Sequence, residues 1–144
     1  MRALLDVNFI IALLHSEHTF HESAHVWWSK NKKLGWASCP LTENGVIRIM
    51  SNPGYRPKVH FTLGDLIAQF QTFASQTDHA FWPDDISLRD SKTFLAERIH
   101  SPRQLTDLYL LALAVKHQGR LVTFDQGIPL SAVPTATAAN LCVV

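Results

Sequence analysis

The sequence has very little cysteine and little charge of either sign. Its two cysteines, Cys39 and Cys142, lie far apart and form no CxxC pair. This spacing excludes a disulfide framework and a paired-cysteine metal site, and it favours a reducing, cytoplasmic environment. Charged residues make up 17% of the chain and the net charge is +1, so composition alone does not indicate nucleic-acid binding.

A long apolar run is also missing. The longest run near the start, Phe9–Leu14, is far too short to cross a bilayer. The opening M-R-A-L-L-D reaches a carboxylate at position 6, so we expect no signal-peptide core and no membrane contact. No repeat, low-complexity tract or linker is visible. With 144 residues, of which 47% are hydrophobic, residues 1–144 are predicted to form one globular domain.

The most informative stretch is G-R-L-V-T-F-D, residues 119–125. Its apolar run, with glycines on both sides, predicts a buried strand. The preceding residues, Thr106–Gln118, contain strong helix formers and no Gly or Pro, so they predict a helix that ends at Gly119. Asp107 begins this helix and Asp125 follows the strand. In open α/β sheets, ligands bind at the edge where the strands end.

The other elements alternate in the same way. Strands are predicted at Ala3–Leu5, Leu34–Ser38, Ala80–Trp82 and Leu141–Val144. Helices are predicted at Val7–Leu14, His18–Lys30, Pro40–Met50, Thr62–Ser75 and Ser91–Arg98, and loops at Ser51–Lys58 and Ile128–Asn140. This order predicts an α/β protein: a three-layer α/β/α fold with a central parallel sheet of four or five strands.

Four acidic residues are expected at the carboxyl edge of that sheet. Asp6 and Glu43 follow the first two strands, Asp125 follows the fourth, and Asp107 begins a helix that can reach the same edge. A helix cap is the simpler interpretation of Asp6, and a favourable helix-dipole contact is the simpler one of Glu43. Yet two carboxylates about 5 Å apart repel by about 3 kcal/mol at an effective dielectric of 20, so four together require a cation.

The expected ligands are all oxygen atoms, which indicates Mg²⁺ or Mn²⁺. Acidic sites that hold one or two such ions commonly hydrolyse phosphodiesters, because the ions activate water and stabilise charge on the attacking and leaving oxygens. Asn8 and Thr123 each lie two residues from an acid, and we expect them to orient the ligands.

Four motifs in this order resemble a known family: L-L-D-V-N, L-T-E-N-G-V-I-R, T-D-L-Y-L-L-A-L-A and L-V-T-F-D. Together, from Leu4 to about Gly127, they resemble the PIN domain, and more narrowly the VapC-type toxins of bacterial toxin–antitoxin pairs. The resemblance places the four acidic metal-site positions at Asp6, Glu43, Asp107 and Asp125, with polar helpers at Asn8 and Thr123.

The resemblance implies a Mg²⁺- or Mn²⁺-dependent endoribonuclease that is usually a homodimer and is inhibited by a cognate VapB-type antitoxin. It leaves open which RNA is cut. One common family feature is a basic residue directly after the last acid, and here that position holds Gln126. This departure concerns local contacts with the substrate and does not affect the acids.

Other interpretations remain open at this level. His15, His18, His21 and His25 have helical spacing that could suggest zinc, but neither Cys nor an acid completes a ligand set. A response-regulator receiver domain also gathers acids at strand ends, but it usually begins with paired acids and needs a late lysine. A PIN-like module that only binds RNA or an antitoxin is the non-enzymatic alternative.

Basic residues are the candidates for the substrate surface, although most charged groups simply face solvent. The loop Ser51–Lys58 is basic and carries Tyr55, a mixture that suits contact with a phosphate backbone or a stacked base. An ordinary solvated loop explains the same residues. The basic candidates in and around this part of the chain are Lys30, Lys32, Lys33, Arg48, Arg56 and Lys58.

Overall fold

The computed structural model describes residues 1–56 and 61–144 and contains a five-stranded, all-parallel sheet. The strands are β1 (Ala3–Leu5), β2 (Trp36–Ser38), β3 (His79–Phe81), β4 (Arg120–Thr123) and β5 (Leu141–Val143), in the spatial order β3-β2-β1-β4-β5. The α-helices are α1 (Val7–Leu14), α2 (His21–Asn31), α3 (Pro40–Ser51), α4 (Leu63–Ser75) and α5 (Leu105–Lys116). The predicted α/β class with a parallel sheet is confirmed.

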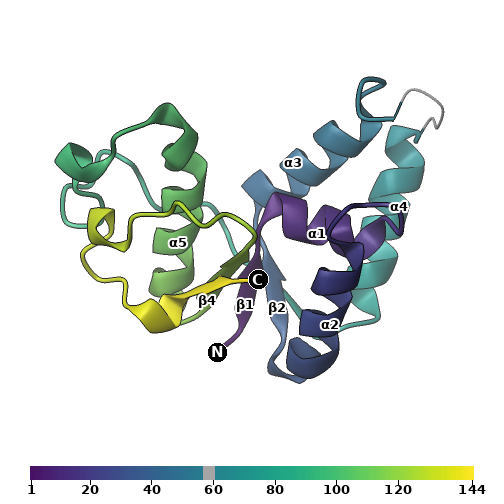
Figure 1. Cartoon of the computed structure of the whole chain (residues 1–144), viewed down its shortest axis with the longest axis horizontal. Coiled ribbons are helices and arrows are strands. Elements are labelled where there is room, and N and C mark those ends of the chain that lie inside the picture. Colours follow the sequence, from purple (N-terminus) through teal and green to yellow (C-terminus); the bar gives the residue numbers. More distant parts are fainter. Residues whose placement is uncertain (57–60) are drawn as a thin grey trace.

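Helices cover both faces of the sheet, with α5 on one face and α1 to α4 on the other (Figure 1). Because side chains alternate along a strand, each strand contributes to both cores. Leu4, Ala37 and Leu121 pack with the residues of α5. The other positions pack with α1 to α4, namely Ala3, Leu5, Trp36 and Val122. Continuous burial of the central strands explains why they appear as plain apolar runs.

The strand order reverses between β1 and β4, which are neighbours in space but lie near opposite ends of the sequence. Leu4 pairs with both Ala37 of β2 and Leu121 of β4. The backbone N–H of Asp6 continues the pairing by donating to the carbonyl oxygen of Val122 at 3.0 Å. Such a reversal opens a crevice at the carboxyl edge, where open α/β sheets bind ligands. Asp6 and Asp125 follow the two strands that form it.

Local chemistry sets most of the helix starts. Pro40 occupies the first position of α3, where its missing N–H costs nothing. Thr62 caps α4, because its hydroxyl oxygen accepts the backbone N–H of Asp65 at 3.1 Å. Both starts agree with the sequence prediction.

The end of α5 differs from the prediction in its detail. Gln118, not Gly119, adopts the left-handed conformation, with φ of 57°. Gly119 serves close packing instead, because a Cβ there would lie 2.6 Å from the carbonyl oxygen of Arg2 and 2.8 Å from Trp82. This glycine therefore lets the chain after α5 approach β1 closely.

The predicted α-helix at Ser91–Arg98 is wrong. Only Ala96–Arg98 is helical, as a single 3₁₀ turn, and turns precede it. The carboxylate of Asp90 accepts the backbone N–H of Lys92 at 3.0 Å and the hydroxyl of Thr93 at 2.7 Å. Such local side-chain bonds compete with helix formation.

Smaller shifts occur at other elements, and the third strand lies at His79–Phe81 where Ala80–Trp82 was predicted. The second helix begins at His21 rather than His18, and β2 begins at Trp36 because Gly35 has a positive φ of 78°. The predicted loop Ser51–Lys58 begins after Ser51, the last residue of α3, and its end lies outside the described residues. Within the described part of the chain, no helix is long and apolar enough to span a membrane.

Candidate active site

Asp6 lies between β1 and α1 as the N-cap of that helix, and it is buried, with 8% of its surface exposed. Its Oδ1 accepts the backbone N–H of Val7 at 2.7 Å, and its Oδ2 accepts the hydroxyl of Thr123 at 2.8 Å. Burial raises the pKa of Asp6, while these two hydrogen bonds oppose that rise. The helix cap considered from the sequence is real, and it fixes a carboxylate at the carboxyl edge of the sheet.

Thr123 connects two of the predicted acids. Its Oγ1 donates to Asp6 and accepts the backbone N–H of Asp125 at 3.1 Å. Asp125 is exposed, and its Oδ1 accepts the backbone N–H of Gly127 at 2.7 Å, which closes a tight turn after β4. A single buried hydroxyl therefore orients the Asp6 carboxylate and anchors the backbone that carries Asp125.

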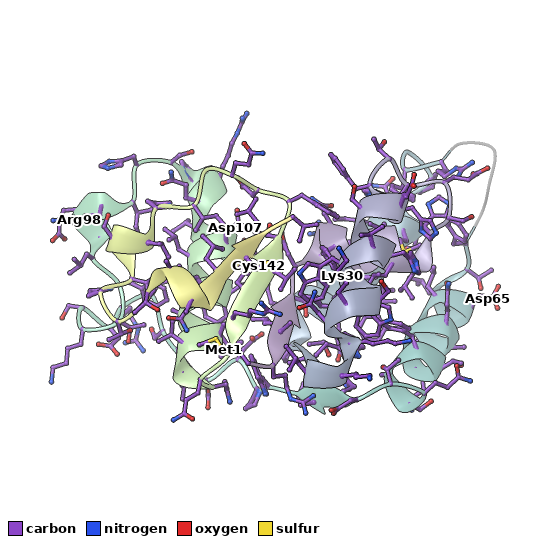
Figure 2. All side chains as sticks on the ribbon, turned by 60° about the horizontal axis from the view of Figure 1, so that its bottom comes forward. Met1, Lys30, Asp65, Arg98, Asp107 and Cys142 are labelled. Carbon is purple, nitrogen blue, oxygen red and sulfur yellow. The ribbon has the colours of Figure 1, made fainter. Side chains whose placement is uncertain are left out.

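Asp107 is the third residue of α5 and lines the same pocket as Asp6 and Asp125, and Figure 2 labels it on the α5 side of the sheet. The pKa of Asp107 is raised to about 7. Burial is the main cause, followed by the negative charge of Asp6 and by the hydrogen bond and charge of Asp125. Helix N-termini favour anions, so burial together with the charges of the neighbouring carboxylates outweighs the helix dipole here. Asp107 therefore carries a proton for part of the time near neutral pH.

Asp6, Asp107 and Asp125 line one pocket of about 450 Å³, which is called the acidic pocket below. Asn8 and Thr123, the two predicted helpers, line it as well, and Asn8 is exposed there. Arg48 of α3 is the single basic residue that lines this pocket among the described residues. Of the basic candidates, Arg48 thus lies at the pocket, whereas Lys58 lies outside the described residues.

Glu43 lies apart from the other three acids. Its Oε2 accepts the hydroxyl of Ser38 at 2.6 Å, and the Ser38 Oγ lies 2.7 Å from Nε2 of His79. Glu43 lines two separate hollows on the far side of α3. The opposite face of α3 meets α1 because Gly45 allows close approach, since a Cβ there would lie 2.7 Å from Cγ2 of Val7.

The residues at the pocket have the chemistry of a hard-metal site. Asp6, Asp107 and Asp125 supply carboxylate oxygens, and neither His nor Cys lines the pocket in the described part of the chain. As they stand, no three Asp, Glu, His or Cys side chains among residues 1–56 and 61–144 converge closely enough to hold a metal ion. Burial is the main reason that the pKa values of Asp6 and Asp107 are raised, and the neighbouring carboxylates raise them further, so a bound cation would favour the charged forms. This donor set fits Mg²⁺ or Mn²⁺.

The four histidines considered as a zinc site make hydrogen bonds within the protein. Nδ1 of His21 lies 2.6 Å from the carbonyl oxygen of Ala12, and Nε2 of His25 lies 2.9 Å from that of Leu13. These carbonyls belong to the last turn of α1, which lacks helical partners for them. His15 contacts Tyr55 through Nδ1, and Nδ1 of His18 accepts the backbone N–H of Phe20. The spacing of His21 and His25 along α2 therefore serves to bond the carbonyl groups at the end of α1.

Phe124 and Phe20 are neighbours of the site that the sequence motifs did not indicate. Phe124 lines the acidic pocket between Thr123 and Asp125, and the ring of Phe20 stacks on it at 4.7 Å between centroids. The order T-F-D after a buried strand places Phe124 beside the last acid, so its position was visible in the sequence. Phe20 is distant in the chain, and no local pattern indicates the contact.

Comparison with known proteins agrees with this architecture. The profile of the PIN domain matches residues 3–134. Ribonuclease VapC44 of Mycobacterium tuberculosis is 48% identical over 146 residues, covering 100% of both chains. Ribonuclease VapC39 of the same organism is 41% identical over 132 residues, covering 92% of this chain and 94% of the relative. Ribonuclease VapC29 is 33% identical over 128 residues, covering 89% of each chain. This chain therefore belongs to the PIN-domain family and, within it, to the VapC proteins.

Proposed function

We propose that this protein is an endoribonuclease that hydrolyses RNA phosphodiester bonds with Mg²⁺ or Mn²⁺, and that it acts as the toxin of a VapBC-type toxin–antitoxin pair. The observation that carries the proposal is that Asp6, Asp107 and Asp125 all line one pocket, where Arg48 is the single basic lining residue among those the structure describes. Relatives named ribonucleases match over the full length of the chain. The catalytic unit is the single domain of residues 1–144.

The residues at the pocket have three proposed roles: binding the metal ion, orienting its ligands and binding the phosphate. Asp6, Asp107 and Asp125 would hold the ion, which would lower the pKa of a water ligand and offset charge on the phosphate oxygens. Thr123 fixes the geometry, because it donates to Asp6 and accepts from the backbone of Asp125. Arg48 faces the same pocket, where its guanidinium can bind a phosphate oxygen.

Glu43 remains a proposed fourth ligand. To reach the metal it must leave the Ser38 hydroxyl and cross to the face of α3 that lines the pocket. Asn8 is proposed to orient water or substrate from the rim, since it is exposed and lines the pocket. A Glu43→Gln variant keeps a hydrogen-bond acceptor for Ser38 but removes the charge that a metal ligand needs.

Two proposed protein partners would cover two different hollows, the acidic pocket and an apolar hollow beside α4. A cognate antitoxin that covers the pocket would insert Arg or Lys among the aspartates, because the pocket lacks positive charge apart from Arg48. A second copy of the chain would cover the exposed apolar hollow that includes Leu63 and Ile67, which are 58% and 56% exposed. Such a nuclease, paired with an antitoxin, would act in the cytoplasm.

The test is a cleavage assay with purified protein and cellular RNA in Mg²⁺, Mn²⁺ or EDTA. The wild type should cut in either metal and not in EDTA, and Asp6→Ala, Asp107→Ala and Asp125→Asn should each lose at least about 100-fold in rate, as expected when a ligand that positions the catalytic ion is removed. An aspartate whose variant keeps near wild-type turnover is wrongly assigned. RNA binding without any cleavage would favour the non-catalytic PIN-like module instead.

A further inference from the structure

A stack of aromatic rings extends from the core to the rim of the acidic pocket. The buried ring of Phe9 packs on Phe124 at 5.1 Å between centroids, with 30° between the planes. Phe124 in turn stacks on Phe20 at 4.7 Å and 26°. His18 lies 6.4 Å from Phe124 at 22°, so its ring is nearly parallel to the same ring. The outer members of this stack, Phe20, His18 and Phe124, are called the aromatic platform below.

The platform is accessible and held in place. Phe20 is 47% exposed, and His18 and Phe124 are half-buried. Nδ1 of His18 accepts the backbone N–H of Phe20 at 3.0 Å, which fixes the turn that enters α2. A rigid, exposed ring loses little conformational entropy when a second ring stacks on it.

The platform also lies between two hollows. Phe124 lines the acidic pocket that contains Arg48. His18 lines a neighbouring hollow together with Tyr55 and Arg56, and no aliphatic side chain lines that hollow in the described part of the chain. Arg56 is paired there with Glu17, so Arg48 is the arginine beside the rings that has no ion pair among the described residues. A basic side chain beside exposed aromatic rings is a combination that binds single-stranded nucleic acid.

These features favour an RNA base over an apolar protein anchor. An anchor from a partner helix needs an apolar groove, whereas the surroundings of His18 are polar. A base in a duplex is already stacked on its neighbours and cannot reach a side chain. A platform beside the cleavage site therefore selects a segment whose base is unpaired.

We propose that the aromatic platform stacks an unpaired nucleobase of the substrate next to the phosphate held in the acidic pocket. This inference rests on the proposed ribonuclease function, and it adds the residues that contact that base. Phe20 makes the main contact because it is the most exposed member of the platform.

The experiment compares Phe20→Leu with Phe20→Trp in an Asp125→Asn background. Leu keeps apolar volume but removes the ring, and Trp keeps a stacking surface. The probe is a short single-stranded RNA with 2-aminopurine in place of adenine, whose fluorescence falls when the base stacks on an aromatic ring. In Mg²⁺ the Leu variant should bind about 5- to 100-fold more weakly, the loss expected for one base–aromatic stack. It should also quench less, and the Trp variant should behave like the parent.

Two controls separate the possible failures. Thermal unfolding of each variant shows whether the fold is intact, and wild-type cleavage in Mn²⁺ tests the ribonuclease function independently of the platform. Equal affinity and quenching in the Leu variant and its parent would overturn the platform proposal even if the wild type cuts RNA. If Phe20→Leu weakened binding to a blunt duplex of the same sequence as much as it weakened binding to the single strand, the selection for an unpaired base would be overturned.

Discussion

Replacing Asp107 by Asn should stabilise the metal-free protein at about pH 8. Asp107 lies with Asp6 and Asp125 at one pocket, and their repulsion together with burial raises its pKa to about 7. The unfolded state binds fewer protons at this group, so wild-type stability falls as pH rises from about 4 through about 7 and is then constant. Asp107→Asn has no carboxyl group at this position, so its stability does not fall with pH for this reason.

The size of the effect comes from the pKa difference. A shift from 3.8 to about 7 has a ceiling of about 4 kcal/mol, at 1.36 kcal/mol per pKa unit. Asp107 is only half-buried, so solvent screening lowers this considerably. Losing a favourable helix-dipole contact costs about 0.3–1 kcal/mol. The expected net gain is about 1–2 kcal/mol, or roughly 3–8 °C in Tm for a domain of this size.

The assay is thermal unfolding in EDTA at about pH 5 and about pH 8, followed by a Mn²⁺ series. Asp65→Asn is the matched control, because Asp65 is exposed and holds the same third position in α4. That control should lose a little stability at both pH values and keep the wild-type response to Mn²⁺. Mn²⁺ should stabilise the wild type by binding its folded form, and it should stabilise Asp107→Asn less. A destabilised Asp107→Asn protein in EDTA at pH 8, with an unchanged Mn²⁺ response, would refute the reasoning.

Three further outcomes are expected. Asp125→Asn should raise the Tm in EDTA and reduce the further rise produced by Mn²⁺; lower stability in EDTA with the full Mn²⁺ response would make Asp125 a structural turn residue. Thr123→Val should lower the free energy of unfolding by about 1–3 kcal/mol, because the buried carboxylate of Asp6 loses a hydrogen-bond donor. The same variant should have a lower kcat, and Thr123→Ser should restore both the stability and kcat. Arg48→Gln should raise KM for RNA with little change in Tm, whereas an unchanged KM would remove Arg48 from the substrate surface.

The sequence predicted the layers of the fold because short-range signals decide them. Apolar runs mark the buried strands, and Thr62, Pro40 and Asp6 mark helix starts where the structure has them. Once the sheet is parallel, acids that follow β1 and β4 must meet at one edge. The convergence of Asp6 and Asp125 could therefore be predicted without any knowledge of side-chain packing.

The direction of Glu43 could not be predicted in that way. Its side of α3 depends on how that helix is rotated, and the close contact between Gly45 and Val7 sets the rotation. That contact joins α1 and α3, which α2 and β2 separate in the sequence, so no local pattern reveals it. The histidines are similar, because His21 and His25 bond to carbonyl groups of another helix. The predicted helix at Ser91–Arg98 is wrong for the opposite reason, since a local hydrogen bond from the Thr93 hydroxyl to the Asp90 carboxylate overrides the helical propensity.

The hydrogen bond from Thr123 to Asp6 has a consequence for synthesis of the protein. It joins residues 117 positions apart, and it forms only when β4 pairs with β1. A ribosome that has released β1 and the first four helices has therefore not yet produced an assembled pocket. The chain gains its acidic centre only near the end of translation, in one step with closure of the sheet. During most of its synthesis the chain therefore carries Asp6 without Asp107, Thr123 and Asp125, so the pocket of the proposed nuclease is not yet assembled.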